Sequence, residues 1–291
     1  MSENSVTNER PSKVGAVFKG LLIMAIYLVT VSIPQLFVLI PITLEALAEG
    51  GMTGYGEVLM QKMAENSANL TISTVAGTVL AVLIMFLWYF FGVYKKEVKN
   101  GTYESVVPKL KDAKAILFII TGAIAGYAVA VLIMDFALWL MPSIGGAYLQ
   151  SIDAVVGGVD ILGFVLTLIL APIGEEICIR GLALNRAKQS YGLIGCMVLS
   201  GIFFGIYHLN PIQGLYAIPM GMFFGYLAYK FNSIVPCVLA HFVNNLLAAF
   251  SGVLGFGTLI VPIVVLVVFG TLAVLIGRKV DSLHTNASET E

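Results

Sequence analysis

Long apolar runs separated by short polar segments dominate the chain. A helix that crosses a bilayer needs about 20 consecutive, mostly apolar residues. Eight segments meet or approach this length, so the pattern predicts an all-α, polytopic membrane bundle of about eight transmembrane helices. The predicted spans lie at 18–41, 71–94, 115–141, 159–179, 193–209, 213–230, 234–250 and 258–277.

The same pattern divides the chain into five parts. The polar ends predict a cytoplasmic N-terminal segment at 1–17 and a disordered C-terminal tail at 279–291. Between them we expect N-terminal transmembrane helices and loops at 18–158, a core that carries polar side chains at 159–250, and a last transmembrane helix at 251–278.

The basic residues give this arrangement an orientation. If the N-terminus is cytoplasmic, 15 of the 16 Lys and Arg residues, Arg180 among them, fall in cytoplasmic segments. The exception is Lys62, in a predicted loop at 42–70 that also carries four glutamates. Cytoplasmic loops of membrane proteins are enriched in Lys and Arg. We therefore expect a multi-pass protein of the cell membrane with both termini in the cytoplasm.

Composition agrees with a membrane protein. Hydrophobic residues make up 58% of the chain and charged residues 11%, whereas about 25% of the residues in a typical soluble domain are charged. The three cysteines lie in apolar segments without a spaced framework, so neither a disulfide scaffold nor a zinc-thiolate site is indicated. The related stretches "GIFFG" at 201–205 and "GMFFG" at 221–225 predict close helix packing.

Two adjacent glutamates interrupt the apolar run "LTLILAPIGEEICIRGLAL". Glu176 and Arg180 are four residues apart and share a helical face, so we expect an ion pair in which Glu176 is structural. Glu175 is rotated by about 100° and is predicted to face an interior cavity, where loss of water suits a carboxylate to act as a general base. A helix end where all three side chains are solvated remains the alternative.

Two histidines occupy further apolar helices. His208 follows Phe204 by four residues, and His241 precedes Asn245 by four, so each pair shares a helical face. A lone buried histidine is more often structural than catalytic. Three separate polar placements on apolar helices are costly, however, and together they favour one shared site with the Glu175 cluster.

These residues suggest amide hydrolysis. Glu175 would hold and deprotonate a water molecule, and His208 would hold the same water or pass the proton to the leaving amine. His241 and Asn245 would donate to the oxyanion. Asn244 is expected to be turned away. No serine is expected beside these groups and the cysteines lack a nearby base, so a covalent nucleophile is disfavoured.

A metal-dependent version stays open. Glu175, His208 and His241 would form a two-histidine, one-glutamate set for a divalent metal such as zinc, with an open position for water. Asn245 suits an oxyanion donor better than a ligand, which favours the version without a metal. The expected cofactor is accordingly none or a divalent metal.

The position of His208 adds a condition. In a continuous helix from 193, His208 would lie near the outer end of its span, away from Glu175 and His241. Pro211 disfavours helix at Asn210. We therefore predict a broken or staggered helix here, with the site inside the membrane and nearer the cytoplasm.

The motifs "EEICIRG", "FGIYH" and "HFVNN" resemble those of the CAAX-protease and bacteriocin-processing family of intramembrane proteases, also called Abi, to which the type II CAAX prenyl endopeptidases are related. The resemblance covers roughly 160–250 and makes 159–250 the expected catalytic core. It implies an all-helical bundle with a catalytic cavity inside the membrane. The family pattern falls on Glu175, Glu176, Arg180, Phe204, His208, His241 and Asn245. The resemblance assigns Glu175 and His208 to water activation, His241 and Asn245 to the oxyanion, and Glu176, Arg180 and Phe204 to support.

The resemblance implies an intramembrane endopeptidase that acts on a membrane-associated peptide or protein within the lipid bilayer, without a nucleic-acid partner. Eukaryotic members remove the last three residues of prenylated CaaX proteins, and bacterial members are tied to bacteriocin self-immunity and peptide processing. The family is often labelled a metalloprotease. A non-catalytic membrane scaffold or bacteriocin-immunity protein is the alternative, while the lack of an inverted repeat disfavours a transporter. The substrate and oligomeric state stay open.

Overall fold

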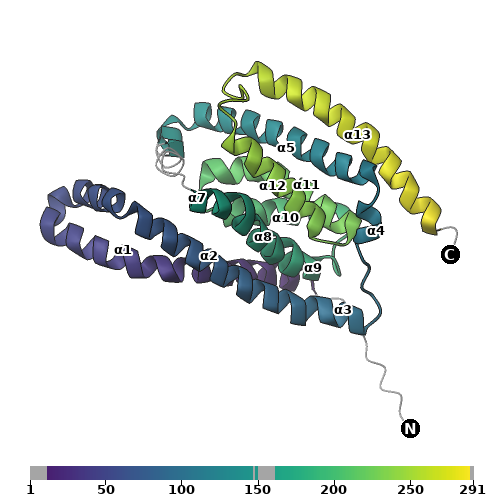
Figure 1. Cartoon of the computed structure of the whole chain (residues 1–291), viewed down its shortest axis with the longest axis horizontal. Coiled ribbons are helices and arrows are strands. Elements are labelled where there is room, and N and C mark those ends of the chain that lie inside the picture. The colour runs from purple at the N-terminus through teal and green to yellow at the C-terminus, as the bar shows by residue number, and fades with distance from the viewer. Residues whose placement is uncertain (1–11, 147, 150–160, 289–291) are drawn as a thin grey trace, which may run out of the picture.

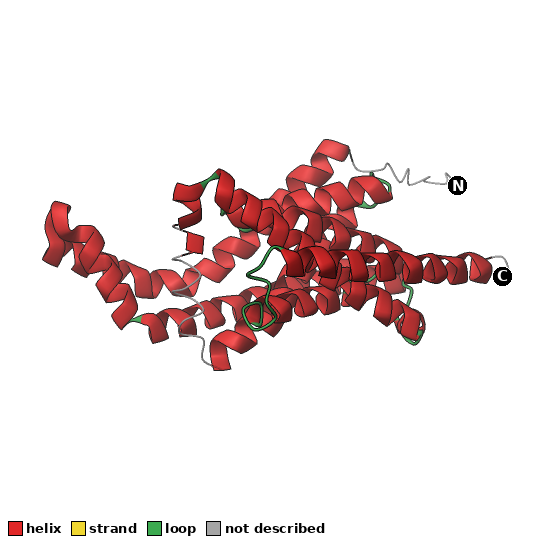
Figure 2. Ribbon diagram, turned by 90° about the horizontal axis from the view of Figure 1, so that it is seen from above, coloured by secondary structure: helices red, strands yellow, loops and turns green. Residues whose placement is uncertain are grey.

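The protein is all-helical throughout the part of the chain that the structure, a computed structural model, describes: residues 12–146, 148–149 and 161–288 (Figures 1 and 2). The predicted all-α class is confirmed for these residues. The helices are α1 (Lys13–Glu65), α2 (Ser67–Tyr89), π-helix η1 (Phe90–Tyr94), α3 (Lys95–Lys99), α4 (Val107–Leu110), α5 (Ala113–Leu140), α7 (Ile161–Val165), π-helix η2 (Leu166–Leu170), α8 (Ala171–Glu176), π-helix η3 (Ile177–Ala183), α9 (Leu184–Ala187), α10 (Leu193–Tyr207), α11 (Pro211–Phe231), α12 (Val235–Ala249) and α13 (Ile260–Ser288).

Five of the eight predicted spans coincide with helices long and apolar enough to cross a membrane: α1, the run from α2 to α3, α5, the run from α7 to α9, and α13. The other three correspond to α10, α11 and α12. Helices α10 and α12 have 15 residues each, or about 22 Å at 1.5 Å per residue, against a hydrocarbon core of about 30 Å. The structure therefore supports five full spans and leaves the eight-span count a prediction.

The bundle has the short helices in its middle. In Figure 1 the α1–α2 hairpin lies along one side, and α5 and α13 lie along the other. Helices α7 to α12 fill the space between these two pairs. Many of the fully buried apolar side chains belong to this middle layer, including Phe203, Phe224 and Leu227. Polar groups in the middle layer are thus enclosed by protein on both sides.

The predicted loop at 42–70 is wrong, because helix α1 continues through most of it. The chain reverses at Gly51, whose backbone (φ 59°, ψ −164°) is non-helical, a conformation that glycine adopts readily. Across this reversal Lys62 Nζ lies 2.8 Å from Glu49 Oε1 and 3.2 Å from Glu45 Oε2. The loop is therefore a helical extension that projects from one end of the bundle (Figure 2).

The C-terminal end of the chain also differs from expectation. Helix α13 continues to Ser288, so most of the tail expected to be disordered at 279–291 is helical. Residues 289–291, and residues 1–11 of the expected N-terminal segment, lie outside the described part of the chain.

Helices α10 and α11 approach each other through glycines, as the two related stretches predict. A Cβ atom on Gly221 would lie 2.9 Å from the Gly201 Cα. A Cβ atom on Gly205 would lie 2.9 Å from the carbonyl oxygen of Gly214. Only glycine leaves room for two backbones at this separation.

The predicted break before α11 is confirmed. Helix α10 ends at Tyr207, and Leu209 adopts a left-handed conformation with φ 50°. Asn210 is extended, and its side-chain oxygen accepts hydrogen bonds from the N–H groups of Ile212 and Gln213 at 3.0 and 3.1 Å. Pro211 then begins α11, where its missing N–H is harmless. The early stop leaves His208 at the end of a short helix in the middle layer.

We expect Gly221→Ala to destabilise the fold by about 1–3 kcal/mol, the usual range for overpacking. The added methyl group would lie 2.8 Å from Phe204 Cβ and 2.9 Å from the Ser200 carbonyl oxygen. Thermal unfolding of the purified protein in detergent measures this change. Gly126→Ala on α5 is the matched control, because its Cβ would meet nothing within 4 Å. Equal unfolding temperatures for the two variants would contradict the proposed close approach.

Candidate functional site

The two glutamates lie on α8, a six-residue α-helix between the π-helices η2 and η3. The run from α7 to α9 is one continuous helix into which two π segments are inserted, and such insertions are frequent at functional sites. Glu175 is 7% exposed and Glu176 0%. The alternative of a solvated helix end is therefore excluded.

Glu176 and Arg180 form the predicted ion pair, with Arg180 Nη1 2.9 Å from Glu176 Oε1. Arg180 is 1% exposed, so counting it among the cytoplasmic cations was wrong. Its Nε donates to Ser200 Oγ at 3.0 Å, and its Nη2 donates to the Gly221 carbonyl oxygen at 3.3 Å. Two of the three donors of this planar fork thus tie α10 and α11 to the η3 segment, and the third holds Glu176 of α8.

Ser200 corrects the expectation that no serine lies beside these groups. Its hydroxyl donates to the Gly221 carbonyl oxygen at 2.6 Å while it accepts from Arg180. Both hydrogen-bonding roles of this hydroxyl are engaged in holding the guanidinium, and none is directed at a base. Ser200 is a support for Arg180 rather than a nucleophile.

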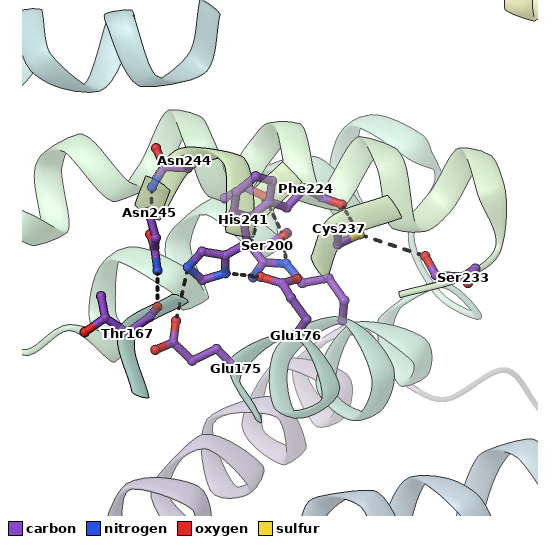
Figure 3. Close-up of polar contacts among 12 residues, drawn as sticks. Thr167, Glu175, Glu176, Ser200, Phe224, Ser233, Cys237, His241, Asn244 and Asn245 are labelled. Carbon is purple, nitrogen blue, oxygen red and sulfur yellow. Dashed lines mark hydrogen bonds and ion pairs between the residues drawn. The ribbon is translucent and has the colours of Figure 1, made fainter. Parts of the chain in front are cut away.

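His241 shares the same carboxylate oxygen. Its Nδ1 lies 2.9 Å from Glu176 Oε1, while its Nε2 lies 3.8 Å from Glu175 Oε2 (Figure 3). Because Glu176 is held by Arg180 as a carboxylate, it can only accept, so Nδ1 carries the proton and donates. The Nε2 that faces Glu175 then has a free lone pair in neutral His241 and an N–H only in the imidazolium form.

Aromatic rings enclose the imidazole. Phe224 stacks on His241 with ring centroids 5.3 Å apart, and Phe204 meets His241 edge-on at 5.4 Å. Phe204 also contacts the His208 ring at 4.9 Å, and the Arg180 guanidinium lies over both phenyl rings at 4.8 and 5.2 Å. Phe204 therefore lies between the two histidines, which are within electrostatic range of each other.

The Glu175 carboxylate has one unsatisfied oxygen, which faces His241. Its Oε2 is buried and has no hydrogen-bond partner among the described protein groups. Two polar atoms 3.8 Å apart, as Glu175 Oε2 and His241 Nε2 are, can both bond one water molecule about 2.8 Å from each. Figure 3 shows the side chains of Glu175, His241 and Asn245 pointing toward one another.

Asn245 is held by its neighbours. Its Nδ2 donates to the Thr167 carbonyl oxygen in η2 at 2.9 Å. Asn244 is buried and donates from its own Nδ2 to Asn245 Oδ1 at 3.0 Å. The expectation that Asn244 is turned away missed this contact, through which it reaches the site.

A tyrosine pair connects the N-terminal helices to the site, which sequence reasoning did not anticipate. The Tyr207 side chain lies beside the Glu175 carboxyl group, and Tyr27 of α1 lies beside Tyr207, with ring centroids 5.8 Å apart. A Cβ atom on Gly174 would lie 2.5 Å from the Tyr27 hydroxyl oxygen, so glycine is required for this approach. Tyr207 adjoins His208 in the sequence and could have been found by that position, whereas no signal marked Tyr27.

The alternative metal set is not assembled. In the described residues, no three His, Cys, Asp or Glu side chains gather closely enough to hold a metal ion. The Nδ1 of His241 is engaged by Glu176, and its Nε2 and the Glu175 carboxylate are two possible ligands without a third. No chemical step is therefore routed through a metal.

We expect Arg180→Met to destabilise the protein by about 3–5 kcal/mol, because it leaves the Glu176 carboxylate buried without its cation. Arg180→Lys should recover only part of this loss, since one ammonium nitrogen cannot replace the contacts to Ser200 and Gly221. Unfolding by denaturant in detergent checks both. The double variant Glu176→Gln/Arg180→Met removes the two charges together and should be more stable than Arg180→Met alone. An Arg180→Met protein as stable as wild type would refute the buried pair.

The comparisons with known proteins concern the same part of the chain. Residues 157–247 match the model of the family described as type II CAAX prenyl endopeptidase Rce1-like. No curated protein and no solved structure matches the chain. The matched stretch contains α7 to α11 and most of α12, and with them every side chain of the buried carboxylate and histidine cluster. The chain is thus a membrane protein whose residues 157–247 form a domain of the Rce1-like type II CAAX prenyl endopeptidase family, a family of proteases.

Proposed function

We propose that the chain is an intramembrane endopeptidase that hydrolyses a peptide bond of a membrane-associated protein or peptide, in CAAX-type or bacteriocin-type processing. One observation carries the proposal. The buried Glu175 carboxylate faces His241 Nε2 at 3.8 Å within a domain of a protease family. A carboxylate and an imidazole at this separation suit the activation of one water molecule.

Glu175 is the general base. It takes a proton from the water held between its Oε2 and His241 Nε2, and the resulting hydroxide attacks the carbonyl carbon of the substrate. The proton then passes to the nitrogen of the leaving amine as the C–N bond breaks, directly or through His208. This sequence consumes one water molecule and leaves Glu175 ionised again.

His241 has a role that depends on its protonation. Because Nδ1–H is engaged by Glu176, His241 donates to the oxyanion only as the imidazolium, with a second proton on Nε2. The Nδ1 of His241 lies 2.9 Å from Glu176 Oε1, and its Nε2 lies 3.8 Å from Glu175 Oε2. Glu176 therefore orients the ring, as the carboxylate does in carboxylate–histidine pairs of other hydrolases. Asn245 supplies the second donor.

The place of the site within the bundle supports this assignment. Helices α10 and α12 are too short to cross and lie in the middle layer, enclosed by the α1–α2 hairpin and by α5 and α13. Irregular backbone at membrane depth is tolerated where protein surrounds it or where it lines a cavity. We infer that the break at Leu209 and Asn210, where the Leu209 side chain is 77% exposed, borders such a cavity next to His208. We infer that water and substrate meet in a cavity bordered by α8, α10 and α12.

We expect Glu175→Gln to abolish proteolysis, with a rate loss of about 10²–10⁴-fold if Glu175 serves only as the base. The amide keeps the size of the side chain but cannot take a proton. Peptidomics of membranes from cells with wild-type protein and from cells with the variant should show products that vanish in the variant. These products also identify the substrate.

Glu57→Gln is the control, because Glu57 is an exposed carboxylate on the projecting part of α1. It should release the same products as wild type. If Glu175→Gln leaves the peptide pattern and the cellular phenotype unchanged, a non-catalytic scaffold or immunity role replaces the proposed one.

We further propose that both termini face the cytoplasm of a cell-membrane protein. The start of α1 and the end of α13 lie at the same end of the bundle, opposite the tip of the α1–α2 hairpin (Figure 2). Basic residues gather on α3, on α4 and in the turn that follows α4, near the end of the bundle where α1 starts and α13 ends. This distribution is typical of cytoplasmic loops.

Cysteine labelling in intact cells tests the orientation. The natural cysteines Cys178, Cys196 and Cys237 are all buried, so a membrane-impermeant maleimide reports introduced thiols. We expect Met52→Cys, at the hairpin tip, to react from outside, because the Met52 side chain is 91% exposed. Lys99→Cys on α3 should react only after permeabilisation. The opposite pattern would reverse the proposed topology.

A further inference from the structure

The carbonyl group of Thr167 lacks its usual helical partner. In an α-helix it would accept from the N–H of Ala171, four residues on. In η2, however, the Ala171 N–H bonds to the Leu166 carbonyl oxygen. The π-helical partner of Thr167 would be residue 172, and Pro172 has no N–H. The π insertion and the proline together free this carbonyl oxygen.

The side-chain amide of Asn245 uses the freed carbonyl. Asn245 Nδ2 donates to Thr167 O at 2.9 Å, and Asn244 Nδ2 donates to Asn245 Oδ1 at 3.0 Å. The amide of Asn245 is thus fixed at both ends, with an acceptor against its nitrogen and a donor against its oxygen. A primary amide has two N–H groups, so one remains, and the Asn245 nitrogen lies on the side of His241 and Glu175 in Figure 3.

We propose that Asn244 is a positioning residue that acts through Asn245. Together with the Thr167 carbonyl, it fixes which end of the Asn245 amide faces His241 and Glu175. A reversed amide would place Asn245 Oδ1 against the Thr167 oxygen and against the oxyanion, so both contacts would be repulsive. The inference rests on the proposed function, in which Asn245 donates to the oxyanion.

The burial of Asn244 is difficult to explain by packing alone. The residue is 9% exposed, and its Oδ1 has no hydrogen-bond partner among the described protein groups. An unsatisfied buried acceptor is unfavourable, and an apolar side chain of the same size would avoid it. A purely structural residue at this position would therefore be improved by leucine, whereas a positioning residue would lose its function.

The test is kinetic and uses the full-length protein in lipid vesicles, with an internally quenched farnesylated CaaX peptide as the probe. Asn244→Leu should lower kcat by about 10²-fold, the effect of losing one oxyanion donor, at nearly constant KM. In an Asn245→Ala background it should lower kcat no further, since both changes remove the same donor. The unfolding temperature of the single variant Asn244→Leu should match or exceed that of wild type.

Asn244→Asp gives a second readout with a defined sign. The ionised carboxylate can only accept, so it attracts the Asn245 nitrogen and reverses the amide. The protonated acid, present at lower pH, donates again to Asn245 Oδ1. The activity of Asn244→Asp relative to wild type should therefore rise as the pH falls. Leu246→Ala, next to Asn245 on the same helix, is the control and should leave kcat unchanged.

The outcomes separate the two proposals. Suppose that Glu175→Gln is inactive. If Asn244→Leu then lowers kcat additively with Asn245→Ala, or if Asn244→Leu acts only by unfolding the protein, the positioning role is wrong and the protease mechanism stands. If Asn244→Leu retains wild-type kcat, the positioning role is equally wrong. If Glu175→Gln cleaves the peptide as fast as wild type, the mechanism fails and the role of Asn244 fails with it.

Discussion

One oxygen atom organises the centre of this protein. Glu176 Oε1 lies 2.9 Å from Arg180 Nη1 and 2.9 Å from His241 Nδ1, so a single buried acceptor joins the helical run that carries the glutamates to α12. The guanidinium extends the connection to α10 and α11 through Ser200 and the Gly221 carbonyl. Charge in a low-dielectric interior is tolerable only with such compensation. The ion pair takes up Glu176 and leaves the Glu175 carboxylate to face the His241 ring.

The close packing of α10 and α11 serves this centre. Glycines at 201, 205, 221 and 225 let the two backbones approach until the Gly221 carbonyl can accept from both Arg180 and Ser200. A larger side chain at these positions would separate the helices and withdraw that carbonyl. The glycine pattern, which looks like ordinary packing, thus belongs to the electrostatic support of the carboxylates.

The sequence predicted those features that depend on helical spacing. The i to i+4 relation of Glu176 and Arg180 predicts their ion pair, and Pro211 after Asn210 predicts the break after α10; both are present. Features that depend on contacts between distant helices were missed. Ser200 and Phe224 have no charge or spacing that ties them to Arg180, and Tyr27 lies more than a hundred residues before Glu175. The 42–70 segment was misread because polar residues on a projecting helix resemble those of a loop, and the single reversal at Gly51 has no distinct signal among several neighbouring glycines.

The π-helix η2 makes segment length a determinant of the chemistry. A π insertion holds one more residue than an α-helical turn of the same rise. Deleting a single residue between Leu166 and Leu170 would return this stretch to α-helical winding, and α8 would keep nearly the same face, because the wider turn is what accommodates the additional residue. The two adjacent carboxylates would keep their faces, but the π-helical turn that contains Thr167, whose carbonyl oxygen accepts from Asn245, would be lost although every motif letter stayed in place. Alignments of such chains need to be read for gaps in this stretch as closely as for substitutions.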